Sequence, residues 1–145
     1  MNVGNGAITA DEFRKRLAAL CLKRGGGGMP KRRRDQHILL KSIALTLDRN
    51  AVYTEAELNL RIQSWLELVG HEIQVDHVSL RRHLVDEGYL TRDPAGDTYV
   101  PVTNPYLEMF DPSIDELTPH SIIDDAVQER EERKQRFLND RTDTD

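Results

Sequence analysis

The chain has 145 residues, of which 38% are hydrophobic and 31% are charged, and its formal net charge is −5 at pH 7. This length and apolar content support one domain of moderate size with polar extensions. A protein that coats nucleic acid over its whole surface would be basic overall, so the net charge excludes that class and restricts phosphate contacts to local patches.

Cysteine content and hydropathy indicate in which cellular compartment the protein is expected. Cys21 is the single cysteine, which excludes an intramolecular disulfide and a CxxC metal motif. No apolar run approaches the roughly 18–20 residues of a membrane-spanning helix, and the N-terminus lacks the apolar core of a secretory signal. We therefore expect a cytoplasmic protein that does not bind membranes.

Charge is distributed unevenly along the chain. Residues 1–50 carry 11 Lys and Arg against 4 Asp and Glu, residues 51–100 carry 4 against 9, and residues 101–145 carry 5 against 12. The local net charges are therefore +7, −5 and −7. The acidic last third would oppose a phosphate contact made elsewhere unless it is held away.

The first helix is predicted over about residues 9–23. Thr9 and Glu12 have the spacing of a capping box, and apolar residues recur at helical spacing after them. The four glycines at residues 25–28 end the helix, because glycine loses much backbone entropy inside one. We interpret them as a flexible hinge, and we expect residues 1–28 to be a segment whose helix docks independently.

Residues 29–103 have the element order of a winged helix-turn-helix domain. Apolar spacing predicts helices over about residues 33–47 and 54–68, and residues 51–53 could form a brief strand between them. The second of these helices starts with another capping box, Thr54-Glu55-Ala56-Glu57. The expected fold class is mainly α with a small β-hairpin, an α+β fold.

A third helix and a hairpin complete this predicted domain. Asp76 can cap the helix by accepting backbone N–H groups, and Gly88 can adopt the left-handed conformation at its end. Two short extended segments follow, joined by a turn that contains Pro94 and Gly96. A short basic helix followed by a hairpin is typical of winged helices.

Residues 104–145 form a predicted acidic extension. Asn104-Pro105 and Asp111-Pro112 indicate turns. Residues 121–139 indicate a charged helix in which opposite charges lie three and four residues apart. Because its apolar positions are sparse, this helix is either solvated or docks one narrow stripe on a partner.

Four groups of residues in the middle of the chain carry a resemblance to a known family. They are the basic start Pro30-Lys31-Arg32-Arg33-Arg34, Tyr53-Thr54-Glu55-x-Glu57, Asp76-His77-x-Ser79-Leu80-Arg81-Arg82-x-Leu84-Val85-Asp86-x-Gly88-x-Leu90, and Arg92 with Gly96-x-x-Tyr99. With these residues the chain from about residue 31 to 101 resembles DUF2087, a bacterial domain family of unknown function. Members occur alone or joined to helix-turn-helix regulators of the arsenic-repressor type. The resemblance therefore implies a winged-helix-like fold and an association with transcription, and it supplies no catalytic residue.

A helical wheel at about 100° per residue separates the two arginines of the third helix. Arg81 falls inside the apolar arc of Leu80 and Leu84. A buried guanidinium needs an acidic partner, because an unpaired buried charge is costly. We therefore expect a structural ion pair for Arg81. The candidate partners are Glu55, Glu57 and Asp76.

Arg82 faces outward on the same wheel, together with Ser79 and His83. A recognition helix offers such a face to the major groove, where arginine can bond guanine through two hydrogen bonds. The alternative is a solvated face on which Arg82 pairs with Asp86 four residues later. Asp86 would also repel phosphate.

Residues 31–34 are the strongest electrostatic feature. Four consecutive cations beside flexible glycines could follow a phosphate backbone, with each neutralised phosphate adding to the salt dependence of binding. The alternative is a charged helix start that only keeps the protein soluble. Cations are unfavourable at a helix N-terminus, so a helix that starts there needs another source of stabilisation.

Other chemistry is not indicated. The five histidines lack metal-ligand spacing, and the glycine run lacks the P-loop arrangement, so we expect no metal and no cofactor. Cys21 lies on an apolar helix face and is interpreted as packing, and His77 as a hydrogen-bonded core histidine. We expect no enzymatic activity. The histidines are His37, His71, His77, His83 and His120.

Two functions remain open from the sequence. The first is a winged-helix protein that binds duplex DNA or is associated with transcription. The second is a protein–protein interaction module or homo-oligomeric adaptor that docks through its terminal helices, because a fold does not fix a function. A third possibility is that the acidic tail covers the basic patch until something removes it. The predicted DNA contacts are Lys31, Arg32, Arg33, Arg34, Ser79, Arg82, His83 and Arg92.

Overall fold

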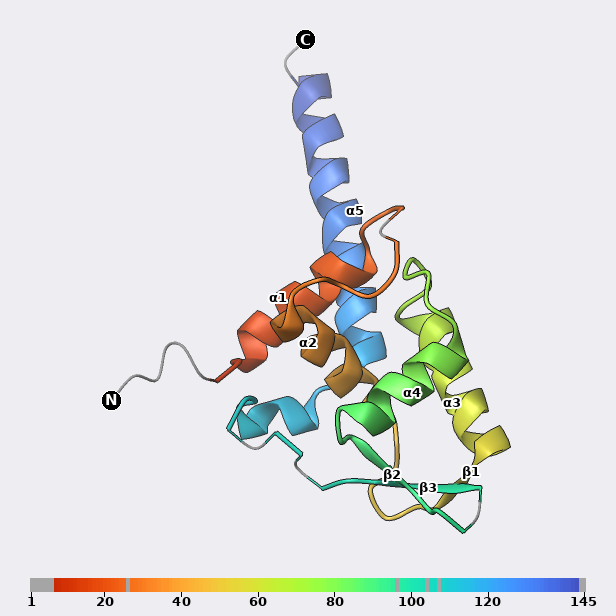
Figure 1. Ribbon diagram of the computed structural model, residues 1–145. Helices are drawn as coiled ribbons and strands as arrows, with labels where there is room; N and C mark the ends of the chain where they lie inside the picture. The colour runs from red at the N-terminus through yellow and green to blue at the C-terminus, as the bar shows by residue number, and fades with distance from the viewer. Residues whose placement is uncertain (1–6, 26, 96, 104, 107, 144–145) are drawn as a thin grey trace.

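The computed structural model describes residues 7–25, 27–95, 97–103, 105–106 and 108–143. This part of the chain is mainly helical with one small antiparallel sheet, as the sequence predicts (Figure 1). The helices are α1 (Ala10–Cys21), α2 (Arg33–Ala44), α3 (Glu55–Leu68), α4 (His77–Asp86), the short 3-10 helix η1 (Pro112–Glu116) and α5 (Pro119–Asp143), and the strands are β1 (Tyr53–Thr54), β2 (Leu90–Arg92) and β3 (Thr98–Pro101).

Three helices and the sheet have a winged-helix arrangement. The hairpin of β2 and β3 follows α4 in the chain. The strand order in the sheet is β1-β3-β2, so β3 pairs with β1, the strand that precedes α3. Tyr53 pairs with Tyr99, and Leu90 pairs with Pro101. The hairpin is confirmed, and β1 begins two residues later than the brief strand predicted at residues 51–53.

Local capping explains where α3 and α4 begin and end. Thr54 and Glu57 form the predicted capping box, with two reciprocal bonds of 3.1 Å. The Asp76 carboxylate accepts the Ser79 N–H at 2.7 Å and so caps α4. Gly88 follows the end of α4 with φ of +82°, a conformation that favours glycine.

The other helix ends differ from the prediction by a few residues. The helix predicted over residues 33–47 stops at Ala44, because the N–H groups of Thr46 and Leu47 bond three residues back and tighten the chain into a turn. The Thr46 hydroxyl also donates to the Ile43 carbonyl at 2.6 Å, which supports this turn. The C-terminal helix begins at Pro119, two residues earlier than predicted.

Helix α2 is buried on nearly all sides, which its sequence pattern does not indicate. The predicted apolar face is confirmed at Ile38, Leu39 and Ile43, which are fully buried. Four polar side chains of α2 are buried as well, between 0% and 7% exposed. These are Asp35, His37, Lys41 and Ser42.

Each buried polar side chain of α2 has a partner on another element. A buried polar group is costly when it is unbonded, so these partners are a condition of folding. Among the described residues, no buried side-chain nitrogen or oxygen lacks a hydrogen-bond partner. The pairs, with the α2 residue first, are Asp35–Arg16, His37–Tyr89, Lys41–Asp115 and Ser42–Trp65.

Two of these partners lie outside residues 29–103. Arg16 belongs to α1 and donates to both Asp35 oxygens, at 3.2 and 2.9 Å. Asp115 belongs to η1 and accepts from Lys41 at 2.7 Å. The flanking segments therefore neutralise charges that α2 buries. The predicted division of the chain at residues 28 and 103 stays a prediction, and Gly26 of the predicted hinge lies outside the described residues.

The two flanking segments also pair with each other. Ile8 donates its N–H to the Met109 carbonyl at 2.6 Å and accepts from the Asp111 N–H at 2.9 Å. The side chains of Ile8 and Phe110 join the same hydrophobic core as α1 and α2. The segments before α1 and before η1, which are far apart in sequence, thus pair with each other and pack in the same core as α2.

Helix α5 has a packed start and an exposed remainder. Ile122 and Ile123 are buried against the core, whereas every described side chain from Val127 to Arg141 is exposed. In Figure 1 this part of α5 extends away from the rest of the molecule. Within the described ranges, no helix is both long and apolar enough to span a membrane.

The Lys41–Asp115 pair gives a test of the role of η1. Burial alone would raise the pKa of Asp115, but Lys41 and Arg49 together hold it below its ordinary value. We expect Asp115→Asn to lower the free energy of unfolding by about 2–3 kcal/mol, because the Lys41 ammonium then stays buried without a carboxylate. Urea unfolding of the full chain measures this change.

The matched control for this prediction is Glu116→Gln. Glu116 is the exposed neighbour of Asp115, and its side chain makes no ion pair within the described part of the chain. This variant should unfold at the wild-type urea concentration. Equal stability of the two variants would show that the Lys41–Asp115 pair does not hold η1 on α2.

Candidate nucleic-acid interface

The outward face of α4 carries the predicted recognition residues. Leu80 and Leu84 anchor the inner face and are fully buried. On the opposite side Arg82 is exposed, and Ser79 and His83 are partly exposed. The structure gives Arg82 no ion pair with any described residue, so the Arg82–Asp86 pair of the solvated alternative is not formed.

Arg81 points to the other side and ties α4 to α3 and β3. Its Nη2 lies 3.3 Å from Glu55 Oε1, and its Nη1 donates to the Asn59 side-chain oxygen at 2.5 Å. The guanidinium also lies 5.9 Å from the centre of the Tyr99 ring. Of the three candidate partners, Glu55 forms the ion pair. The other two, Glu57 and Asp76, cap their own helices.

Arg92 lies on the hairpin that follows α4. Its side chain is half exposed, 4.0 Å from an Asp97 oxygen and 5.8 Å from the centre of the Tyr99 ring. Tyr99 is therefore flanked by the guanidinium groups of Arg81 and Arg92. The Tyr99 ring attracts the Arg92 guanidinium through a cation–π contact, while Asp97 is itself exposed and holds it weakly.

The basic run at the start of α2 divides into two kinds of residue. Arg33 donates to both Glu87 oxygens, at 3.0 and 2.7 Å, and Arg34 donates to both Glu12 oxygens, at 2.8 and 2.9 Å. These hydrogen bonds lower the pKa of both carboxyl groups. The two carboxylates also offset the unfavourable position of cations at a helix N-terminus.

Lys31 and Arg32 remain available at this site. Both are exposed, and neither forms an ion pair with another described residue. The Arg33–Glu87 pair places the start of α2 beside the C-terminal end of α4. Lys31 and Arg32 directly precede Arg33 in the chain and therefore lie near this contact.

A buried aromatic cluster, which the sequence does not indicate, lies behind the end of α4. His37 Nδ1 lies 2.8 Å from the Tyr89 hydroxyl, and the His37 ring packs edge-on against Tyr106 at 4.4 Å. The Tyr106 hydroxyl donates to the Glu87 carbonyl at 2.7 Å. The cluster of His37, Glu87, Tyr89 and Tyr106 joins α2, the connection between α4 and β2, and the C-terminal extension.

The prediction that His77 is the core histidine is wrong. His77 is the first residue of α4 and is only partly buried, with Gln63 at 3.4 Å. The open end of a helix leaves its first residue near solvent, whatever its angle on the wheel. His37, which is 1% exposed, is the core histidine of the described chain.

Cys21 packs in the core, as the apolar spacing suggests. It is fully buried, and burial raises the pKa of its thiol to about 12, so the thiol is protonated at neutral pH. In the described ranges, no group of three or more His, Cys, Asp or Glu side chains is placed to hold a metal ion.

The aromatic cluster predicts a pH dependence of stability. Burial lowers the pKa of His37, the nearby Glu87 carboxylate opposes this shift, and the Arg33 guanidinium reinforces it. The unfolded chain takes up the proton first, near the ordinary value of about 6.5. The stability that the neutral ring contributes is therefore complete above that pH and is lost as the pH falls toward the folded pKa.

We expect His37→Gln to flatten this dependence. Between about pH 7 and pH 5.5, the free energy of unfolding of the unaltered chain should fall more steeply than that of the variant, by up to about 1.4 kcal/mol per pH unit. Urea unfolding at several pH values measures both slopes. His77→Gln is the matched control and should keep the original slope. If the curves of the unaltered chain and of His37→Gln ran parallel, His37 would not be the source of the pH dependence.

Comparison with known proteins identifies the family. A sequence model described as an uncharacterized protein conserved in bacteria, DUF2087, matches residues 27–100. This is about half of the 145 residues and includes the winged-helix elements from α2 into β3. Neither the curated proteins nor the solved structures that were compared gave a match. The chain therefore belongs to the DUF2087 family.

Proposed function

We propose that this protein binds duplex DNA through α4 and the hairpin, as a non-enzymatic protein associated with transcription. Arg82 carries the proposal, because it stands exposed on the outward face of α4 without a carboxylate partner in the described chain. Arginine is the side chain that most often specifies guanine in the major groove. Ser79 and His83 share this face and supply further hydrogen-bonding groups.

The support behind α4 favours this role. Leu80 and Leu84 fix the inner face in the core, and Arg81 bonds to α3 through Glu55 and Asn59. Binding groups on a rigid, supported element keep the geometry that base recognition requires. The outward side chains of α4 are therefore carried by a helix that is held firmly against the domain.

The phosphate contacts of the proposal are fewer than the basic run suggests. Carboxylates already hold Arg33 and Arg34, so the proposed phosphate contacts are Lys31, Arg32 and Arg92. Each neutralised phosphate contributes about −0.9 to the slope of log affinity against log salt, so we expect a slope near −3. The exposed Asp86 weakens non-specific attraction to DNA, which makes affinity depend more on base contacts.

The two neighbouring arginines of α4 provide a test with opposite outcomes. Arg82→Ala should weaken binding to DNA by about 1–3 kcal/mol and leave stability unchanged. Arg81→Ala should lower the free energy of unfolding by about 1–2 kcal/mol, because Glu55 and Asn59 lose their partner. Fluorescence anisotropy with duplexes enriched from a random pool by the full chain measures binding, and urea unfolding measures stability.

The control for binding is Arg14→Ala, which removes an exposed arginine of α1 that makes no ion pair in the described chain. It should bind the enriched duplexes as the unaltered chain does. A failure of any duplex to be enriched at low salt, or equal binding by the Arg82→Ala and Arg14→Ala variants, would refute the proposed role of α4.

A second function is favoured by the exposed part of α5. From Val127 onward this helix has only exposed side chains among those described, and Val127 and Phe137 are 42% and 61% exposed. Most of the stability of a helix in a protein comes from the packing of an apolar face, so contact with a partner would stabilise this part of α5. We therefore propose, as the alternative, a homo-oligomeric adaptor in which α5 docks on a second copy.

Sedimentation velocity over a range of concentrations tests this alternative. Association of the full chain through α5 should be lost in the double variant Val127→Asp, Phe137→Asp, because two charges would be buried in the apolar contact. Leu60→Asp is the control, since Leu60 is 67% exposed on α3 and lies outside α5. A monomer at every concentration, or equal association by both variants, would exclude this use of α5.

A further inference from the structure

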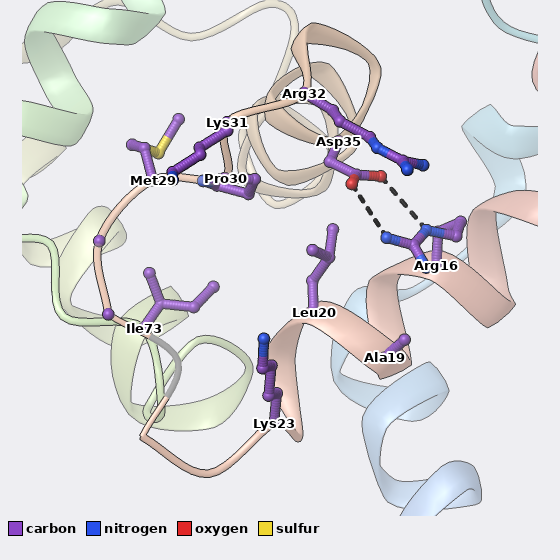
Figure 2. A pocket seen from close by; sticks show the side chains of 12 residues that line it. Arg16, Ala19, Leu20, Lys23, Met29, Pro30, Lys31, Arg32, Asp35 and Ile73 are labelled. Carbon is purple, nitrogen blue, oxygen red and sulfur yellow. Dashed lines mark hydrogen bonds and ion pairs between the residues drawn. The ribbon is translucent and has the colours of Figure 1, made fainter.

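A pocket of about 550 Å³ opens beside the N-terminus of α2. Its walls come from the end of α1, the glycine-rich segment, the start of α2 and the connection between α3 and α4. In Figure 2 the side chains of Leu20, Lys23 and Ile73 point toward the segment that carries Pro30 and Lys31. The outward face of α4 does not contribute to this pocket.

The lining of the pocket has an excess of positive charge. Four cations line it against one carboxylate, Asp35. Arg16 is already bound to that carboxylate through two hydrogen bonds. The other three cations form no ion pair within the described ranges. They are Lys23, Lys31 and Arg32.

The N-terminus of α2 adds to the positive electrostatic potential of the pocket. Arg32 occupies the N-cap position and makes no capping hydrogen bond with its side chain. The first backbone N–H groups of a helix lack partners inside the helix and carry partial positive charge. An anion in the pocket would therefore meet backbone donors as well as three cationic side chains.

The pocket also has an apolar floor, which a site for phosphate alone would not need. Leu20, Met29 and Ile73 line it and pack against the hydrophobic core. Its volume lies within the range of about 300–1,000 Å³ for small-molecule sites, where a few polar groups orient a mostly apolar ligand. We propose that this pocket binds a small organic anion, with a phosphate or carboxylate group joined to an aromatic or aliphatic body.

One wall of the pocket is continuous with the start of α4. The Gln74 N–H donates to the Gly27 carbonyl at 3.0 Å, which fastens the glycine-rich segment to the α3–α4 connection. Ile73 lies in this connection, three residues before the N-cap Asp76. The ligand would thus contact both segments at their junction. Lys31 and Arg32 are shared with the DNA contacts proposed above, whereas Lys23 and the apolar floor belong to the pocket alone.

The direct test is isothermal titration of the full chain with 1-naphthyl phosphate. This probe combines a charged group with an apolar body, and two controls separate its parts: inorganic phosphate has the charge alone, and 1-naphthol has the body alone. The proposal predicts saturable binding of one 1-naphthyl phosphate per chain, with each control at least about tenfold weaker. Absence of saturable binding at millimolar probe would overturn it. Equal binding of inorganic phosphate would overturn it as well, and would indicate a simple counter-ion site.

A pair of charge reversals locates the binding. Lys23→Glu should weaken binding of 1-naphthyl phosphate by about tenfold or more, because a cationic partner of the anion becomes a repelling carboxylate. Arg14→Glu makes the same change on an exposed residue outside the lining and should bind as the unaltered chain does. Equal affinity of the two variants would refute the proposed location. Both should melt at the temperature of the unaltered chain, since both residues are exposed.

The same titration distinguishes this site from the DNA surface. Arg82→Ala should keep its affinity for 1-naphthyl phosphate, because Arg82 lies outside the pocket lining. Lys23 is likewise absent from the proposed DNA contacts. Saturable probe binding by a chain that enriches no DNA duplex at low salt would therefore refute the proposed function alone. Loss of probe binding in Arg82→Ala would contradict the pocket.

Discussion

The structure depends on the partners of the polar groups that α2 buries. Asp35, His37, Lys41 and Ser42 are all enclosed, and a buried polar group without a partner is costly. Their partners lie in α1, in η1, in α3 and at Tyr89 just before β2, so each bond fixes a different part of the chain against the central helix. Two of these elements lie outside the part of the chain that matches the family. The flanking segments therefore stabilise the domain by neutralising charges that it cannot satisfy alone.

Two further ion pairs at the start of α2 determine which basic residues remain free to bind an anion. Glu12 and Glu87 hold Arg34 and Arg33, which joins the start of α2 to α1 and to the end of α4. Among the described cations that no carboxylate holds, some lie in two places that can bind different partners. Arg82 stands on the outward face of α4, and a second group surrounds the pocket at the α1–α2 junction. An acidic protein can thus offer two local anion-binding surfaces, because its carboxylates occupy specific cations and leave others unpaired.

The features that the sequence could predict are local ones. The caps at Thr54 and Asp76 and the turn at Gly88 depend on residues within a few positions, and all three are in place. Arg81 could be recognised because an arginine within an apolar arc requires a partner. The pairs of Arg33 and Arg34 could not, because their carboxylates lie 54 and 22 residues away and no periodicity links them. The burial of the polar side of α2 could not be predicted for the same reason, since elements distant in sequence cover it.

The most direct test of this account is to map the amide chemical shifts of the full chain as an enriched DNA duplex is added at low salt. We expect changes along residues 76–92, which include α4 and β2, and at Lys31 and Arg32. Changes should disappear together as salt is raised, because phosphate contacts supply much of the affinity. Changes confined to α5, or none in α4 while the duplex is bound, would contradict the central claim that α4 presents the binding surface.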